Sequence, residues 1–183
     1  MIRKTTKELL TDSFIELAQR KPVNKITVAD ITSNCGMAAP TFYRHFRDKY
    51  DLIVWVHLSQ AQKIMGQIGK DGYQWRDTLL DGAKYFAQNQ RFFINALSHT
   101  SGRDAFEVRM SELNTELIVD EIRKRLMTEN VPEHYRDMAR IYCFGTVHFV
   151  YKWLERDMPQ SPEEVAEIME ACLPEPLKPF LYP

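Results

Sequence analysis

Apolar residues recur at helical spacing along most of the chain. In residues 5–20, the spacing of Leu10, Phe14 and Leu17 predicts a first helix, and Pro22 lies in the break that follows it. Later apolar patterns predict further helices over residues 49–66, 75–89, 105–129, 133–156 and 161–172, with a short segment at 90–97. No stretch shows the alternation typical of a strand. The pattern therefore predicts an all-α fold.

Residues 27–52 have the pattern of a helix-turn-helix. Thr27 is a good N-cap, and Asp30 has the spacing of a capping box at the start of a short helix. Cys35 and Gly36 end that helix, because glycine accepts the left-handed conformation that a sharp turn requires.

A second short helix follows this turn. Pro40 lies at its start, where a missing N–H costs nothing. Phe42 and Phe46 are four residues apart and share the predicted buried face, whereas Tyr43 and Arg44 are left outward. A short helix that displays small residues, hydroxyl groups and a cation suits insertion into a DNA major groove.

The charge distribution fits this prediction. Residues 1–50 hold nine Lys and Arg against five Asp and Glu, a net charge of +4, and the remainder carries −5. A basic module on an acidic body favours attraction of that module to phosphates. Chance variation of surface charge is the alternative, and the helix-turn-helix pattern favours the functional interpretation.

This region resembles the DNA-binding domain of the TetR family of bacterial one-component regulators. The resemblance covers residues 5 to about 58 and rests on Ile26–Ile31, Gly36–Met37, Thr41–Phe46, and Lys49 with Leu52. The family often has Ser at the position of Ala38 and a cation or polar residue at that of Ala39. The resemblance implies a three-helix DNA-binding domain over residues 1–50 and a helical effector-binding and dimerisation domain over residues 51–183.

The resemblance also implies roles in DNA binding. The matching positions contact phosphates through Thr27, Thr41, Tyr43, His45 and Lys49, with Tyr43 also near bases. Arg44 can reach either a guanine edge or a phosphate. The remaining positions, Ala38, Ala39 and Pro40, offer only apolar contact, for instance to a thymine methyl group. Few bases are then read by hydrogen bonds, which favours recognition of DNA shape.

The helix predicted over residues 133–156 is apolar on more than one side between Met138 and Leu154. Such a helix is either the core of a monomer or is also buried against a second copy. The family resemblance implies a homodimer formed by the last two helices as a four-helix bundle, as a palindromic operator requires. The candidate interface comprises Ile141, Tyr142, Gly145, Phe149, Trp153, Val165, Ile168 and Met169.

The middle of the chain is rich in aromatic residues. The resemblance implies an effector pocket there, for which the candidates are Trp75, Tyr85, Phe86, Phe92, Phe93, His99, Arg103, Phe106 and Met110. Ordinary core packing is the alternative for each aromatic residue. A weaker resemblance to regulators of dihydroxyacetone-kinase operons, around residues 73–75 and 89–93, leaves the effector as either a small molecule or a protein. This weaker resemblance also leaves open whether the regulator activates transcription instead of repressing it as expected.

Catalysis is not expected, because the chain lacks a nucleophile elbow, a zinc-protease motif, a Cys-x-x-Cys pair and a phosphate-binding loop. The five histidines are scattered, and His148 is predicted to be a core residue. No cofactor, metal or membrane partner is predicted. Three widely spaced cysteines and the absence of a signal peptide or membrane span predict a cytoplasmic protein.

The sequence thus predicts a transcriptional regulator, expected to be a repressor, that binds a palindromic operator in double-stranded DNA as a dimer. An unknown small molecule or partner protein would control it through the C-terminal domain. The alternative is a helical protein-interaction module whose DNA binding is weak or lost.

Overall fold

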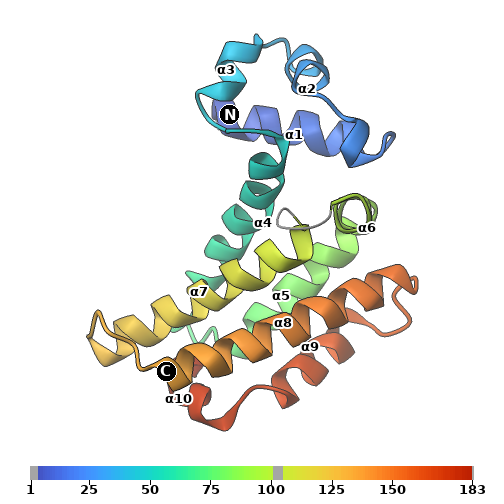
Figure 1. Cartoon of the computed structure of the whole chain (residues 1–183). Coiled ribbons are helices and arrows are strands. Elements are labelled where there is room, and N and C mark those ends of the chain that lie inside the picture. The colour runs from blue at the N-terminus through green and yellow to red at the C-terminus, as the bar shows by residue number, and fades with distance from the viewer. Residues whose placement is uncertain (1–3, 101–104, 183) are drawn as a thin grey trace. The chain divides into compact units, whose positions relative to one another are not determined.

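The computed structural model describes residues 4–100 and 105–182. Every regular element within these residues is a helix, which confirms the predicted all-α fold (Figure 1). None of these helices is long and apolar enough to cross a membrane. The chain divides into two compact units: unit 1 comprises Met1–His57 and Arg91–Phe106, and unit 2 comprises Leu58–Gln90 and Glu107–Pro183. The boundary between the DNA-binding domain and the C-terminal domain, predicted at residue 50, stays a prediction.

Unit 1 contains the helix-turn-helix and a segment from later in the chain. Its elements are α1 (Thr6–Ala18), η1 (Val23–Lys25), α2 (Val28–Asn34), α3 (Ala39–Tyr43), the first part of α4 (Lys49–Met65) and most of α6 (Gln90–Ser98). Its core is formed by fully buried apolar residues from all these helices, including Leu10, Phe14, Ile26, Ile31, Phe42, Leu52, Phe92 and Phe93.

Two contacts tie the helices of unit 1 together. The Ser13 hydroxyl of α1 donates a buried hydrogen bond of 2.7 Å to the Ile31 carbonyl of α2. The rings of Phe14 and Phe92 meet edge to face at 6.1 Å, which joins α1 to α6. Such aromatic pairs favour this geometry because a ring edge is positive and a ring face negative.

Unit 2 contains the rest of α4, α5 (Trp75–Gln88), α7 (Phe106–Leu126) from its second residue onward, α8 (Glu133–Glu155) and α9 (Pro162–Ala171). Here α5 packs against α9. Helices α8 and α9 lie side by side (Figure 1), and the Tyr142 hydroxyl donates to the Met169 carbonyl at 3.0 Å. The predicted start of α9 is confirmed, since Ser161 and Glu164 form a capping box with Pro162 in the first turn.

The proline-rich tail folds further than the sequence pattern indicates. α9 ends before it, as predicted, but two short helices follow: η3 (Glu175–Leu177) and α10 (Lys178–Leu181). Each has a proline at its first or second position, where no backbone N–H is needed. Leu177, Phe180 and Leu181 are buried, so the tail belongs to the core of unit 2.

The prediction that His148 is a core residue is wrong. Its side chain is 58% exposed, and its Nδ1 lies 2.8 Å from the Glu107 carboxylate on α7. The apolar residues around it on α8 do not form a complete ring, because one side of the helix faces solvent.

Candidate nucleic-acid interface

The start of α2 is fixed by a capping box and an ion pair. The Thr27 hydroxyl accepts the Asp30 N–H at 3.1 Å, and the Asp30 carboxylate accepts the Thr27 N–H at 2.8 Å. Lys21 lies 2.7 Å from the same carboxylate. The hydrogen bond from Lys21 is the main cause that lowers the pKa of Asp30 to about 2, and the hydrogen bond from the Thr27 N–H adds to it. The capping box predicted from sequence is confirmed.

The turn between α2 and α3 depends on Gly36. Its φ is +68°, and the next residue, Met37, donates its N–H to the Thr32 carbonyl at 2.8 Å. A Cβ added at Gly36 would meet nothing within 4 Å. The left-handed backbone conformation, rather than crowding, is therefore why glycine is required here.

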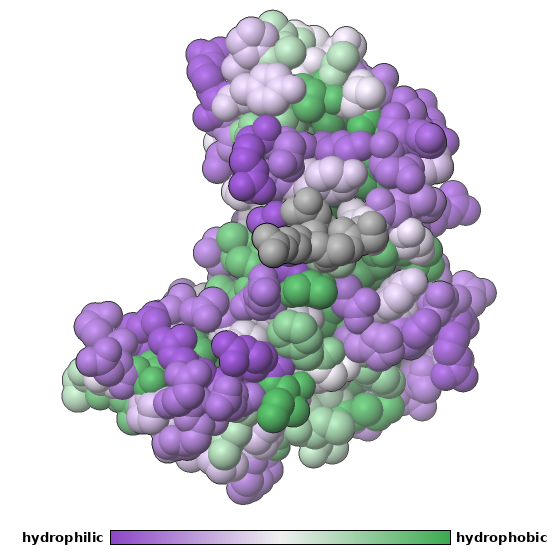
Figure 2. Space-filling view, viewed as in Figure 1, coloured by the Kyte–Doolittle hydropathy of each residue, from purple (hydrophilic) through white to green (hydrophobic). Residues whose placement is uncertain are grey.

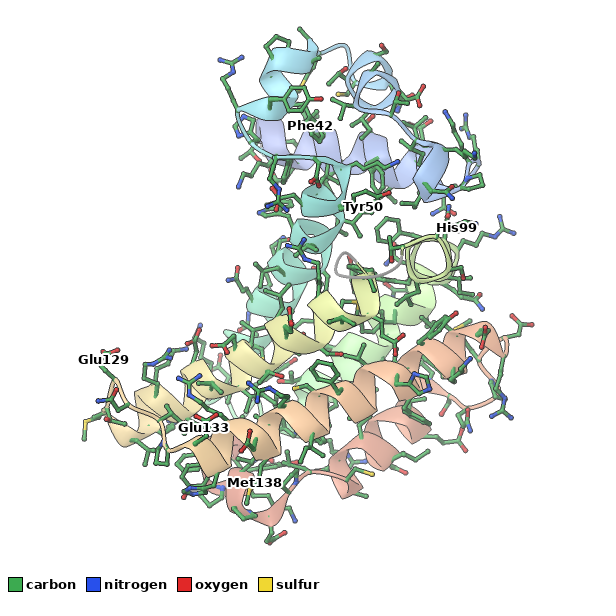
Figure 3. All side chains as sticks on the ribbon, in the orientation of Figure 1. Phe42, Tyr50, His99, Glu129, Glu133 and Met138 are labelled. Carbon is green, nitrogen blue, oxygen red and sulfur yellow. The ribbon has the colours of Figure 1, made fainter. Side chains whose placement is uncertain are left out.

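Helix α3 is short and is held by its buried aromatic side. Phe42, labelled in Figure 3, is fully buried, and Phe46 is 3% exposed. Their ring centroids are 5.7 Å apart, and Phe46 also meets Trp55 of α4 at 5.9 Å. Ala38 is the N-cap and makes no side-chain hydrogen bond. The helix start therefore lacks the cap that Ser, Thr, Asp or Asn would supply.

The opposite side of α3 is exposed. The Tyr43 side chain is 60% exposed, and the Arg44 Nη2 donates to the Thr41 hydroxyl at 3.0 Å. Of the sequence-predicted DNA contacts, the exposed residues are Thr27, Ala38, Ala39, Pro40, Tyr43 and Arg44, and the half-buried ones are Thr41, His45 and Lys49. Unit 1 thus presents a surface of small, hydroxyl-bearing and cationic residues on and beside a short helix that Phe42 anchors in the core.

Lys49 has internal partners that the sequence did not indicate. Its Nζ donates to the carbonyls of Val23, Asn24 and Ile26 at 3.0, 2.8 and 2.8 Å. Burial is the main cause that lowers the pKa of Lys49 below its ordinary value. The ammonium group therefore fastens the connection between α1 and α2.

The candidate effector residues fall into both units. In unit 1, Phe93 stacks with Phe106 at 6.3 Å and meets Phe92 at 5.1 Å, and all three rings are buried. His99, labelled in Figure 3, lies after α6, and its Nδ1 is 2.9 Å from the Asn95 carbonyl oxygen. The three phenylalanines thus form part of the unit 1 core.

Trp75, Tyr85, Phe86 and Met110 belong to unit 2. Trp75 is 5% exposed, and its ring lies 6.3 Å from that of Tyr142. Met110 is buried, whereas Tyr85 and Phe86 are half-buried. Arg103 lies outside the described residues. An open groove of about 560 Å³ in this unit has a different lining, formed by Glu167, Glu170, Ala171, Lys178, Pro179 and Tyr182.

The candidate dimer residues divide by exposure. Tyr142, Trp153, Val165 and Met169 are buried in unit 2, and Phe149 is half-buried, whereas Ile141 and Ile168 are 74% and 41% exposed and Gly145 is exposed too. Phe144, which is not among the candidates, is 39% exposed and has the helical spacing from Ile141 that places both on one face. Figure 2 shows green apolar surface on the face of unit 2 that α8 crosses.

In the ranges that the structure describes, no three His, Cys, Asp or Glu side chains are grouped so as to hold a metal ion. Cys143 is buried, and burial raises the pKa of its thiol to about 12. A protonated thiol in such surroundings is inert, so Cys143 is a packing residue.

Two family models match the chain. Residues 10–55 match the model described as bacterial regulatory proteins, tetR family. Residues 73–174, more than half of the chain, match the model described as a transcriptional regulator C-terminal region. Both matches are to regulators, which confirms the prediction that the protein is not an enzyme.

Individual relatives agree with these matches. The dhaKLM operon transcriptional activator DhaS of Lactococcus lactis subsp. lactis (strain IL1403) is 26% identical over 88 residues, which are 48% of this chain and 46% of the relative. The match thus spans about half the length of that protein.

Solved structures show the same fold over nearly the whole chain. The structure named dihydroxyacetone kinase operon activator DhaS has a TM-score of 0.66 at 19% identity and covers 96% of this chain and 98% of its own. Thermus thermophilus FadR, a TetR family repressor in complex with lauroyl-CoA, has a TM-score of 0.62 at 14% identity, with 91% and 92% covered. The chain belongs to the TetR family of bacterial transcriptional regulators.

Proposed function

We propose that the protein binds a palindromic operator as a homodimer, with α3 of each copy in the DNA major groove. The observation that carries this proposal is the two-sided character of α3. Phe42 fixes one side in the core with Phe46, which follows the helix, and the other side exposes Tyr43 and the C-cap Arg44 beside small residues. A rigid short helix with an exposed polar side matches the recognition helix of a helix-turn-helix.

The proposed DNA contacts are those that the sequence predicts. Hydroxyl groups of Thr27, Thr41 and Tyr43, together with His45 and Lys49, bind phosphates, and Arg44 binds a guanine edge or a phosphate. Ala38, Ala39 and Pro40 touch bases through apolar atoms only. Because Lys49 already donates to three carbonyls, its contact with phosphate would require exchange of at least one of them.

The exposed apolar residues of α8 and α9 support the dimer. Ile141, Phe144 and Ile168 remain substantially exposed in the single chain, and Gly145 beside them allows close approach of a second backbone. Apolar side chains gain free energy when a second copy removes them from water. A two-fold dimer would also match the two-fold symmetry of a palindromic site.

The effector is proposed to act on the C-terminal domain. The names of the relatives allow both kinds of control, because FadR was solved with lauroyl-CoA, and DhaS is named only as an operon activator. A small molecule or a partner protein is therefore the proposed effector. FadR is named as a repressor and DhaS as an activator, so the two relatives regulate transcription in opposite directions. The three thiols, free of disulfides, fit action in the reducing cytoplasm.

Selection of bound duplexes from a random DNA pool with the full chain tests the proposal. Enrichment of one palindrome with half-sites about one helical turn apart, or somewhat more, is expected. The enriched operator then serves for affinity measurements with Arg44→Ala, and Arg156→Ala in unit 2 is the matched control because both arginines are exposed. A reporter under this operator gives the sign of regulation.

Failure to enrich any sequence at low salt would overturn the proposal. The alternative, a helical interaction module with weak or lost DNA binding, would then take its place. Equal affinities of the Arg44→Ala and Arg156→Ala variants would remove the role assigned to Arg44. A loss in the first variant alone supports α3 as the reading helix.

A further inference from the structure

The end of α1 and the connection that follows it (residues 18–26) are held by a side chain from α6. The Asn95 Nδ2 donates to the carbonyls of Ala18 and Lys21, both at 2.8 Å. Its Oδ1 accepts the N–H of Val23 at 2.9 Å. One amide therefore satisfies three backbone groups of a segment that lies more than 70 positions earlier in the chain. All of these residues belong to unit 1.

Lys49 holds the same connection from α4. Val23 is shared between the two side chains: its N–H donates to Asn95, and its carbonyl accepts from Lys49 at 3.0 Å. The Val23 side chain is fully buried below them. Backbone groups outside regular helices need partners of this kind, because an unpaired buried polar group costs free energy.

The connection leads directly into the proposed DNA-binding surface. Its last residue, Ile26, precedes Thr27, the N-cap of α2. Lys21, whose carbonyl Asn95 binds, pairs through its ammonium group with Asp30, the other half of the capping box. A shift of this segment would therefore move the start of α2.

The chemistry of the site is specific for an asparagine. The two carbonyls require two donors, and the N–H requires one acceptor, which a primary amide supplies together. An aspartate would keep the acceptor, lose both donors and place a negative charge beside the two carbonyl oxygens. An alanine would lose all three hydrogen bonds.

We infer that Asn95 is a positioning residue for DNA binding: from α6 it fixes the connection that places Thr27 and the start of α2 against the operator. The inference rests on the proposed function. It assigns to α6, which lies outside the helix-turn-helix in sequence, a direct part in shaping the DNA-binding surface. Asn95 itself need not touch DNA.

The fold should survive loss of this side chain. α6 remains packed on α1 through the edge-to-face pair of Phe14 and Phe92. Lys49 continues to hold Val23, Asn24 and Ile26. The variant is therefore expected to lose local order in residues 18–26 rather than its tertiary structure.

The test compares Asn95→Ala with Asn89→Ala, measured against the selected operator at several salt concentrations. Asn89 is the matched control because its amide also donates to a backbone carbonyl, that of Tyr85, but within unit 2. We expect operator affinity to fall about 10-fold for Asn95→Ala only. The slope of log Kd against log salt should stay unchanged, because a positioning residue neutralises no phosphate.

Hydrogen exchange supplies a second readout. The Val23 amide, which donates to Asn95, should exchange faster in Asn95→Ala, whereas amides of α8 should keep their protection. If Asn95→Ala does not fold, Asn95→Ser provides the comparison, since it stays polar and neutral but its single O–H donor cannot serve both carbonyls.

Each contrary outcome has its own meaning. Wild-type affinity in a folded variant whose Val23 amide exchanges faster would overturn the inference and leave the proposed function intact. An equal loss in Asn89→Ala, or a smaller salt slope in Asn95→Ala, would also overturn it, in favour of general destabilisation or a direct phosphate contact. A wild-type protein that binds no DNA would overturn the proposed function itself.

Discussion

Lys21 and Asp30 meet at the start of α2, with the ammonium nitrogen 2.7 Å from a carboxylate oxygen. The same carboxylate accepts the N–H of Thr27 at 2.8 Å. The charged form of Asp30 is thus stabilised in the folded chain, and its pKa falls from 3.8 to about 2. The first helix of the helix-turn-helix therefore depends on an ionised carboxylate.

This relationship predicts an acid-sensitive contribution to stability. A carboxyl group whose pKa is lowered on folding stabilises the fold above its unfolded pKa, and the effect disappears as pH falls through the folded pKa. Asp30 should accordingly stabilise the fold above about pH 4 and lose this contribution between about pH 4 and pH 2. Urea unfolding at constant protein concentration over this range measures it.

Asp30→Asn provides the comparison. Other carboxylates, such as Glu155 and Glu163, also have lowered pKa values and titrate in both proteins. The difference in unfolding free energy between wild type and Asp30→Asn isolates Asp30 and should shrink as the solution is acidified. A difference that is constant from pH 6 to about pH 2 would contradict the assigned role.

The missing cap of α3 predicts a stabilising substitution. Ala38 has extended backbone angles suited to an N-cap, and Pro40 has no N–H. The hydroxyl group added by Ala38→Ser would therefore share the N–H of Thr41, which already donates to the Ala38 carbonyl at 2.9 Å. Because this N–H already has a partner, the substitution should raise the unfolding free energy by only about 0.5 kcal/mol, the low end for an N-cap. Ala39→Ser is the control, because it adds the same hydroxyl at the first helical position. Equal gains in both variants would refute capping as the cause.

The left-handed turn at Gly36 predicts the opposite effect. Gly36→Ala should lower the unfolding free energy by about 1–2 kcal/mol, the cost of a left-handed conformation for a residue with a Cβ. Gly82→Ala in α5 also meets nothing within 4 Å and should instead gain about 0.5–1 kcal/mol from helix propensity. Thermal or urea unfolding distinguishes the two. A neutral Gly36→Ala would show that the turn relaxes without strain.

Local features of the fold were accessible from the sequence. The capping box of Thr27 and Asp30, the turn at Gly36 and the start of α9 at Ser161 each depend on residues within three positions of one another. The buried pair of Phe42 and Phe46 follows from helical spacing alone. Residues close together in the sequence determine such features, and the structure confirms them.

Features that depend on distant residues were not accessible. Asn95 and Lys49 bind backbone groups of the same connection between α1 and α2. The hydrophobic periodicity of the sequence does not predict which polar side chain will bind the backbone of a distant segment. The exposure of His148 depends on which side of α8 the rest of unit 2 covers. Leu177 is buried because the tail folds back, although its prolines suggest an extended segment. The effector and dimer residues remain predictions for the same reason.

The exposed apolar face of α8 predicts the effect of a charge at its centre. Ile141 is 74% exposed in the single chain, so Ile141→Glu should not disturb unit 2, and glutamate is a good helix former. In the proposed dimer the same carboxylate would be buried in the interface, where its desolvation opposes association. A loss of about 2 kcal/mol, the size of a hot-spot effect, is expected for a charge buried at such a site. The dimer dissociation constant, measured by sedimentation, should therefore rise roughly 30-fold or more.

Met127→Glu is the matched control for this prediction. Met127 is 92% exposed and directly follows α7, a helix that contributes none of the residues proposed for the interface. This variant should dimerise and bind the operator like the wild type, whereas Ile141→Glu should lose operator affinity as its dimer dissociates, because two half-sites are then no longer bound together. A dimer that forms equally well with Glu at position 141 would exclude this face of α8 from the interface.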